Sequence, residues 1–173
     1  MEIWKDIEGY EGLYQVSNLG NVKSLNRLIK HNRSGFLKLK SKIIKPCTTK
    51  TGYVVFHLYK NSKQTHKTAH RLVAECFLEN IFSKEDINHI DGNKLNNNIL
   101  NLEWNTRSEN LKHAYNTGLK ERGEKHYNSK LTEKNILIIR ELKGFSHTKI
   151  AEQYNVSRKC ISKIINKETW KHV

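Results

Sequence analysis

The sequence is poor in cysteine and has no long apolar run. Its three cysteines, Cys47, Cys76 and Cys160, are scattered and form no C-x-x-C pair, so neither a disulfide framework nor a zinc ribbon is predicted. Reduced cysteines in a cytoplasm fit this pattern better. The N-terminus lacks the apolar core of a signal peptide, and no apolar stretch approaches the roughly 20 residues that would span a bilayer. We therefore expect a soluble, cytoplasmic protein without a membrane partner.

Hydrophobic and acidic residues are both scarce. Hydrophobic residues make up 36% of the 173 positions, which is thin for one large core and favours several small modules. Only 17 Asp and Glu oppose 31 Lys and Arg, and the formal net charge is +14. Because the basic residues run along the whole chain, a polyanion such as nucleic acid is the expected partner. A solvated basic surface without a partner is the alternative.

Residues 1–68 have the pattern of short strands separated by turns. The segment LYQVSNLGNVKSL predicts a hairpin around Asn18 and Gly20, and YVVFHLYKNSKQTHKT predicts another that turns at Asn61 and Ser62. We expect a small antiparallel β module that contacts DNA. Basic residues on its strands could follow a duplex backbone, namely Lys23, Arg27, Lys30, Lys38 and Lys40.

Residues 69–117 change from helical spacing to an asparagine-rich stretch and back. The segment TAHRLVAECFLEN has an apolar stripe at helical spacing. Residues 87–90 then predict a short strand, DGNKLNNN an extended loop, and LEWN a second strand. Thr106 and Glu109 form a capping box that starts a helix ending at Gly118. The predicted order is strand, loop, strand, helix.

The remaining chain predicts a linker and a helical domain. Residues 118–130 are polar and punctuated by glycine, which indicates a basic linker. Residues 131–173 predict three short helices, one over residues 132–143 and two more capped by Ser146 and Ser157, with a tight turn at YNVS. This is the pattern of a helix-turn-helix, whose third helix would present to DNA Arg158, Lys159, Ser162 and Lys163. A charged solvated face is the alternative.

The asparagine-rich stretch contains the residue types that phosphodiester hydrolysis requires, which are a base to activate water and ligands for a cation. His89, at the end of the first strand, would be the general base. Asn88 and Asn110 could offer oxygen ligands to Mg²⁺ or Mn²⁺, and His113 could add a ligand or contact a phosphate. Asn101 could bond backbone groups across the loop and so fix His89.

Simpler interpretations stay open for these residues. The stretch could be a polar surface loop with incidental histidines. Asp91 lies near the predicted site, but turn formation with Gly92 explains it at least as well as metal binding. His70 could position a phosphate or merely cap its helix. Leu102 and Trp104 are expected in the core.

With these motifs in place, the sequence resembles the HNH homing endonucleases encoded by phages and their introns. NHIDGNKLNNNILNLEW followed by SENLKHA is similar to the ββα-metal motif of that family, with His89 as its first letter, Asn101 as its second and Asn110 as its third. WKDIEGYEGLYQVSNLGNVKS resembles the accompanying N-terminal module, and AHRLVAECF resembles the helix before the catalytic unit. The resemblance covers nearly the whole chain.

The resemblance implies hydrolysis of one DNA strand per active site with a single divalent metal ion, leaving 5′-phosphate and 3′-hydroxyl ends. Aspartate often stands in the family where this chain has Asn88, and an amide holds Mg²⁺ less tightly than a carboxylate does. Asn110 stands where other members have histidine, and His113 is an alternative ligand nearby. Residues also expected to bind DNA are His70, Arg71 and Arg107.

We therefore predict an α+β protein with a small antiparallel β module, a ββα-metal nuclease unit and a three-helix helix-turn-helix. It would act as a monomeric, site-specific endonuclease on double-stranded DNA, in the bacterial host cytoplasm if a phage encodes it, and would nick one strand. The alternative is a DNA-binding regulator with an inactive nuclease unit, against which the presence of His89, Asn101 and Asn110 argues. An RNA-binding protein would usually show aromatic platforms that this chain lacks.

Overall fold

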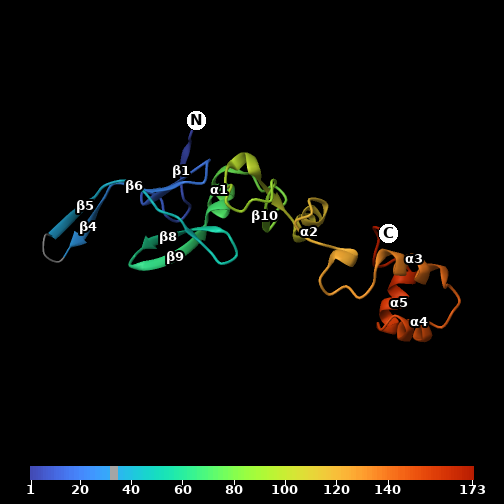
Figure 1. The fold of residues 1–173 in the computed structure, drawn as a ribbon. Helices are drawn as coiled ribbons and strands as arrows, with labels where there is room; N and C mark the ends of the chain where they lie inside the picture. Colours follow the sequence, from blue (N-terminus) through green and yellow to red (C-terminus); the bar gives the residue numbers. More distant parts are fainter. Residues whose placement is uncertain (32–34) are drawn as a thin grey trace. The chain divides into compact units, whose positions relative to one another are not determined.

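The computed structural model describes residues 1–31 and 35–173. In this part of the chain the fold is α+β, as the sequence predicts: antiparallel sheets come first, a ββα unit follows, and helices come last (Figure 1). The chain divides into two compact units, Met1–Ala114 and Tyr115–Val173. None of the described helices is both long and apolar enough to cross a membrane.

The first sheet forms where short alternating segments meet at a tight turn. Its strands are antiparallel and lie in the order β1-β2-β3-β6. They are β1 (Trp4–Asp6), β2 (Tyr14–Ser17), β3 (Val22–Ser24) and β6 (Lys42–Ile43). The turn between β2 and β3 contains Asn18 and Gly20, which confirms the first predicted hairpin. Gly20 has φ 90°, a conformation that side-chain-bearing residues rarely adopt.

Two further sheets precede the first helix. One is a ribbon of β4 (Arg27–His31) and β5 (Gly35–Leu39), and the other contains β7 (Cys47–Thr48), β8 (Val54–Lys60) and β9 (Lys63–Thr68). Strands β8 and β9 turn at Asn61 and Ser62, whose φ values are 52° and 60°. Two consecutive residues with positive φ match the right-handed twist of paired strands. The second predicted hairpin is therefore confirmed.

The asparagine-rich region folds in the predicted order of strand, loop, strand and helix (Figure 1). Its elements are α1 (Ala69–Phe77), β10 (Asp86–His89), the 3₁₀-helix η1 (Ile99–Asn101), β11 (Leu102–Asn105) and α2 (Arg107–Asn116). Glu109 N donates to Thr106 Oγ1 at 3.3 Å, and Thr106 N donates to Glu109 Oε2 at 2.8 Å. This reciprocal pair is the predicted capping box.

One hydrophobic core joins the N-terminal sheets to the ββα unit. Leu72 and Val73 of α1 are buried in it together with Val16 of β2, Leu58 of β8 and Leu102 of β11. The apolar stripe of this helix therefore faces the core, as expected. The predicted boundary after residue 68, between the β module and the nuclease unit, falls inside this core. Separate functions for these two parts stay a prediction.

Three short helices form the second unit. They are α3 (Glu133–Glu141), α4 (His147–Gln153) and α5 (Arg158–Ile165). Both α3 and α4 pack on α5, where the side chains of Ile136, Ile139, Ile161 and Ile164 are fully buried. The predicted tight turn separates α4 from α5, and Asn155 within it has φ 51°.

The helix starts follow the predicted caps, with one difference. Ser157 Oγ accepts a hydrogen bond from Cys160 N at 3.2 Å, and Thr132 forms a reciprocal capping box with Asn135. Ser146 stands at the N-cap of α4 as expected, but its side chain makes no capping hydrogen bond.

Part of the segment predicted as a linker is structured. Gly123–Lys125 forms the 3₁₀-helix η2, and Glu124 Oε2 accepts a hydrogen bond from Glu133 N at 3.0 Å. Gly123 has φ 65°, and a Cβ there would lie 2.6 Å from His172 Nε2. The positive φ favours glycine here, and the close approach shows that the segment contacts His172, near the C-terminus.

Candidate active site

His89 ends β10 as one of the buried polar residues of the first unit. Its side chain is 6% exposed, and the strand register places it opposite Leu102 of β11. Burial lowers the pKa of His89, although the hydrogen bond with Asn97 and the charge of Asp91 act in the opposite direction. The imidazole is therefore neutral at neutral pH, which is the form that a general base needs.

Asn97 contacts the His89 ring directly, and the sequence alone does not single it out. Asn97 Oδ1 lies 3.3 Å from His89 Nε2, and Asn97 Nδ2 donates to Leu95 O at 3.0 Å. The side chain is 5% exposed. Asparagine also occupies the positions on both sides, and the sequence does not tell which of the three points inward.

Asn101 spans the loop between the two strands. Its Oδ1 accepts from Asp91 N at 3.0 Å, and its Nδ2 donates to Asp91 Oδ1 at 2.8 Å and to Asn96 O at 2.9 Å. Its carbonyl accepts from Ile90 N at 2.9 Å. These bonds hold the backbone that directly follows His89, and the positioning role of Asn101 stays a prediction.

Asp91 organises the same loop. Its carboxylate accepts from Asn93 N at 2.8 Å and from Asn96 Nδ2 at 2.7 Å, in addition to the Asn101 amide. These hydrogen bonds, that of Asn96 first, lower the pKa of the Asp91 carboxyl group. The geometry matches the turn-forming role of Asp91, one of the two roles that the sequence leaves open.

Asn88 points to the opposite face of the strand from His89 because side chains alternate. Its Nδ2 donates to Glu103 Oε1 at 2.9 Å, and Asn105 Nδ2 donates to the same oxygen at 3.0 Å. Asn88 is 5% exposed. Glu103, which no sequence motif singles out, thus brings a negative charge beside the predicted ligand Asn88.

The other predicted metal ligands lie on α2. Asn110 is half-buried in the first turns of this helix, and His113 follows it by three positions on the same face. Among residues 1–31 and 35–173, no group of three or more His, Cys, Asp or Glu side chains is arranged to hold a metal ion. The amide oxygens of Asn88 and Asn110 are ligands of a different type, and their role stays a prediction.

His70 and Tyr53 lie next to the His89 ring. The ring centroids of His70 and His89 are 5.2 Å apart, and those of Tyr53 and His70 are 5.1 Å apart. Burial lowers the pKa of His70 to about 4, with smaller contributions from His89 and Arg71. His70 is therefore neutral at neutral pH. Its Nδ1 is buried without a hydrogen-bond partner, while its Nε2 lies 3.3 Å from Thr68 Oγ1.

The two arginines predicted to bind DNA differ in their surroundings. Arg71 donates to Glu85 O at 2.9 Å and lies over the Trp104 ring, 5.9 Å from its centroid. Arg107 is exposed at the start of α2. Arg71 is thus partly committed to internal contacts, and DNA binding by either residue stays a prediction.

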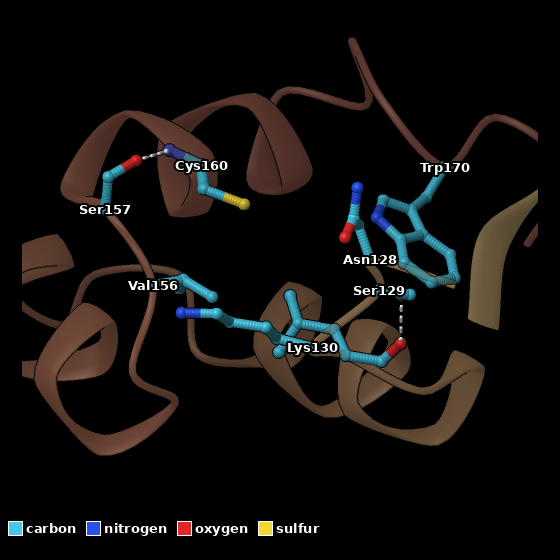
Figure 2. Close-up of a pocket in the computed structure, with 8 residues that line it drawn as sticks. Asn128, Ser129, Lys130, Val156, Ser157, Cys160 and Trp170 are labelled. Carbon is cyan, nitrogen blue, oxygen red and sulfur yellow. Dashed lines mark hydrogen bonds between the residues drawn. The ribbon is translucent and has the colours of Figure 1, made fainter. Parts of the chain in front are cut away.

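The predicted recognition residues lie on α5, where Arg158 and Lys159 are exposed and Ser162 and Lys163 are half-buried. A pocket of about 360 Å³ adjoins the start of this helix (Figure 2). Its lining residues are Asn128, Ser129, Lys130, Leu131, Val156, Ser157, Cys160 and Trp170. Lys130 is the only charged residue among these, and none of them is a base that could activate the Cys160 thiol. The pocket therefore carries no catalytic assignment.

Comparison with known sequence families gives two adjacent matches. Residues 2–59 match the NUMOD4 motif, and residues 67–112 match the HNH endonuclease family. The second match contains every predicted catalytic residue. HNH nucleases generally use a divalent metal ion.

Several curated proteins and one solved structure are similar to the chain. The SPbeta prophage-derived putative HNH homing endonuclease YosQ of Bacillus subtilis is 36% identical over 144 residues, which are 77% of this chain and 82% of YosQ. The DNA endonuclease I-HmuI of Bacillus phage SP01 is 40% identical over 115 residues, which are 66% of this chain and 59% of I-HmuI. The uncharacterized HNH endonuclease L247 of Acanthamoeba polyphaga mimivirus is 42% identical over 125 residues, which are 68% of this chain and 27% of L247. The chain thus matches less than two thirds of the length of I-HmuI and only about a quarter of the length of L247.

The solved structure describes DNA binding and cleavage by the HNH homing endonuclease I-HmuI. It superposes with a TM-score of 0.57 and 28% sequence identity, covering 93% of this chain and 88% of that one. The fold similarity therefore extends beyond the two matched motifs to the C-terminal helices.

Proposed function

The chain belongs to the HNH homing endonuclease family and carries an N-terminal NUMOD4 module, and from this premise we propose that it is a site-specific DNA endonuclease. It hydrolyses one phosphodiester bond with the help of one divalent metal ion. The observation that carries the proposal is the placement of His89, a neutral buried histidine held at the end of a strand by the loop that follows it.

His89 is the general base in this proposal. Its imidazole takes a proton from the water that attacks the phosphorus atom, and a lowered pKa keeps it ready to do so at neutral pH. Asn101 fixes the backbone of residues 90 and 91, so the ring keeps one position relative to the scissile phosphate. General bases typically contribute ~10²–10⁴-fold to the rate.

Asn88 and Asn110 are the proposed metal ligands, with His113 as the alternative to Asn110. Oxygen ligands suit Mg²⁺ and Mn²⁺. The Asn88 amide nitrogen already donates to Glu103, which turns its Oδ1 away from that carboxylate and leaves the oxygen to act as a ligand. Glu103 also adds the negative charge that an amide lacks. When bound, the metal ion supplies positive charge to the phosphoryl and leaving oxygens.

Double-stranded DNA is the proposed substrate. I-HmuI is described as binding and cleaving DNA, and the basic excess of this chain suits the same partner. In this proposal Arg158, Lys159, Ser162 and Lys163 contact DNA from α5. In the unit that contains His89, the proposed DNA-binding residues are His70, Arg71 and Arg107. Because His70 is neutral at neutral pH, it would add no charge to such a contact.

One HNH unit contains one base and one proposed metal site, so we propose that a monomer cuts one strand. A second candidate function is that of a DNA-binding regulator with an inactive nuclease unit. Supercoiled plasmid that carries candidate target DNA, incubated with Mg²⁺ or Mn²⁺ and with or without chelator, separates the two. Metal-dependent relaxation supports the enzyme, whereas tight binding without any relaxation supports the regulator.

A further inference from the structure

The donor and acceptor pattern around Asn97 determines which nitrogen of His89 carries its proton. Leu95 O can only accept a hydrogen bond, and it lies 3.0 Å from Asn97 Nδ2. The amide must therefore point its NH₂ group at Leu95 and its oxygen at His89, where Oδ1 lies 3.3 Å from Nε2. An oxygen acceptor at that place favours a hydrogen on Nε2. The lone pair of the neutral ring is then on Nδ1.

Asn97 is itself held by the first sheet of the molecule. A Cβ built on Gly20 would lie 2.7 Å from Asn97 Cβ, so the backbone of the turn between β2 and β3 touches this side chain. Two positions after Asn97, the backbone N–H of Ile99 donates a hydrogen bond to Asn18 O at 2.8 Å. The Asn18–Gly20 turn therefore packs directly against Asn97 and the backbone that follows it.

We propose that Asn97 is a positioning residue that fixes the proton of the neutral His89 ring on Nε2, and that the Asn18–Gly20 turn holds Asn97 in place for this purpose. The N-terminal sheet then contributes to the chemical step as well as to DNA binding. This inference rests on the proposed role of His89 as the base. Loss of the correct tautomer cost about 10⁴-fold in kcat in a serine protease triad, which shows how large such an effect can be.

The substitution Asn97→Leu tests the first part because it keeps the shape of the side chain and removes its acceptor. Two-bond ¹H–¹⁵N correlation spectra of the metal-free protein, at alkaline pH where the rings are neutral, distinguish the protonated ring nitrogen from the bare one. The His89 signals are assigned by their loss in His89→Gln. We expect Nε2–H in the parent protein and loss of this preference in Asn97→Leu. Asn97→Asp retains an acceptor and should retain the Nε2–H form.

Cleavage kinetics should change in parallel. Asn97→Leu should lower kcat at least ~10-fold and leave KM for DNA within about twofold, because the ring and not the DNA surface is affected. A purely structural role would change the melting temperature without changing the tautomer, so both are measured. Asn97→Asp should recover most of the parent's Nε2–H signal even if its stability is lower.

Gly20→Ala tests the second part, and Gly12→Ala is its matched control. Both glycines have positive φ, 90° and 71°, but a Cβ at Gly12 meets nothing within 4 Å. Both substitutions should therefore cost similar backbone strain, and only Gly20→Ala should push on Asn97. We expect Gly20→Ala to disturb the His89 tautomer and lower kcat, and Gly12→Ala to do neither.

The proposal is overturned if the parent protein carries the proton on Nδ1, or if folded Asn97→Leu keeps the parent tautomer. Equal effects of Gly20→Ala and Gly12→Ala on the His89 spectrum would overturn the role of the turn. A failure of the proposed function gives a different result. If His89→Ala cleaves DNA at the full rate, His89 is not the base, whatever the spectrum of the parent protein shows.

Discussion

The asparagine-rich loop between β10 and β11 and the helical unit after Tyr115 keep their shapes in different ways. The apolar side chains of Ile90 and Leu95 in the loop are exposed, and hydrogen bonds from Asn101, Asp91 and Asn96 hold it. The helical unit is held by fully buried isoleucines between its helices. Directional bonds place individual atoms, whereas apolar packing mainly sets stability. We therefore expect substitutions in the loop to alter chemistry and substitutions on the helical surface to alter DNA binding.

The largest effect is expected at the base. His89→Ala should lower the cleavage rate at least ~100-fold, the usual lower range for removal of a general base, and should leave the affinity for DNA unchanged. Single-turnover cleavage and gel-shift titrations measure the two quantities separately. Unchanged cleavage by the folded variant would refute the assignment.

Asn101→Ala should come next because it removes three side-chain hydrogen bonds that hold the loop. The free energy of unfolding should fall by about 1–3 kcal/mol, the cost of leaving buried partners unsatisfied. The cleavage rate should fall by more than the loss of folded protein explains, since the backbone after His89 is no longer held in place. If activity per folded molecule stays at the parent level, Asn101 acts on stability alone.

Two substitutions at the proposed metal site should have opposite effects on the Mg²⁺ concentration that cleavage requires. Asn88→Asp should keep activity or reduce the Mg²⁺ concentration needed for it, because a carboxylate binds Mg²⁺ more tightly than an amide does. Asn110→Ala should raise that concentration. Metal titrations of cleavage measure both. If neither substitution changes the metal titration curve, the assignment moves to His113 and Asp91.

His70 should make stability depend on pH. Its pKa is lowered to about 4 in the folded protein, while an unfolded histidine titrates near 6.5. Between these values the unfolded chain binds a proton that the folded protein excludes, so the free energy of unfolding falls as the pH drops from about 6.5 to about 4. The loss is about 3 kcal/mol at most, and solvent near the partly exposed ring reduces it. Urea unfolding across this range should show a flatter profile for His70→Gln, and identical profiles would contradict the account.

The smallest effect is expected on the helical surface. Lys159→Ala should weaken DNA binding and reduce the slope of log affinity against log salt by about 1, as the loss of one phosphate contact does. Lys143→Ala, at an exposed position after α3, is the matched control. If Lys159→Ala instead abolishes cleavage at saturating DNA, the division between the loop and the helical surface is wrong.

Local signals in the sequence predict much of this fold. The Asn61–Ser62 turn, the capping box of Thr106 and Glu109 and the Ser157 cap follow from residue types at fixed spacing. Each depends on contacts within a few residues, which is why one sequence suffices.

Long-range packing accounts for what the sequence does not reveal. Asn97 could be recognised only once the turn at Gly20 is known to touch it. Glu103 meets Asn88 through strand register, which is fixed by pairing and not by either residue alone. The sequence around Gly123 has the composition of a linker, and the residue that it contacts, His172, is far away in the chain.

A time course on supercoiled plasmid with a single target tests the central claim most directly. One HNH site should produce nicked circles first in the presence of Mg²⁺ or Mn²⁺, at a rate proportional to protein concentration, with linear DNA absent or late. Strand-specific end labels should place the cut at one phosphate of one strand. Linear product without a nicked precursor, formed at a rate that rises with the square of protein concentration, would contradict the account and indicate a dimer.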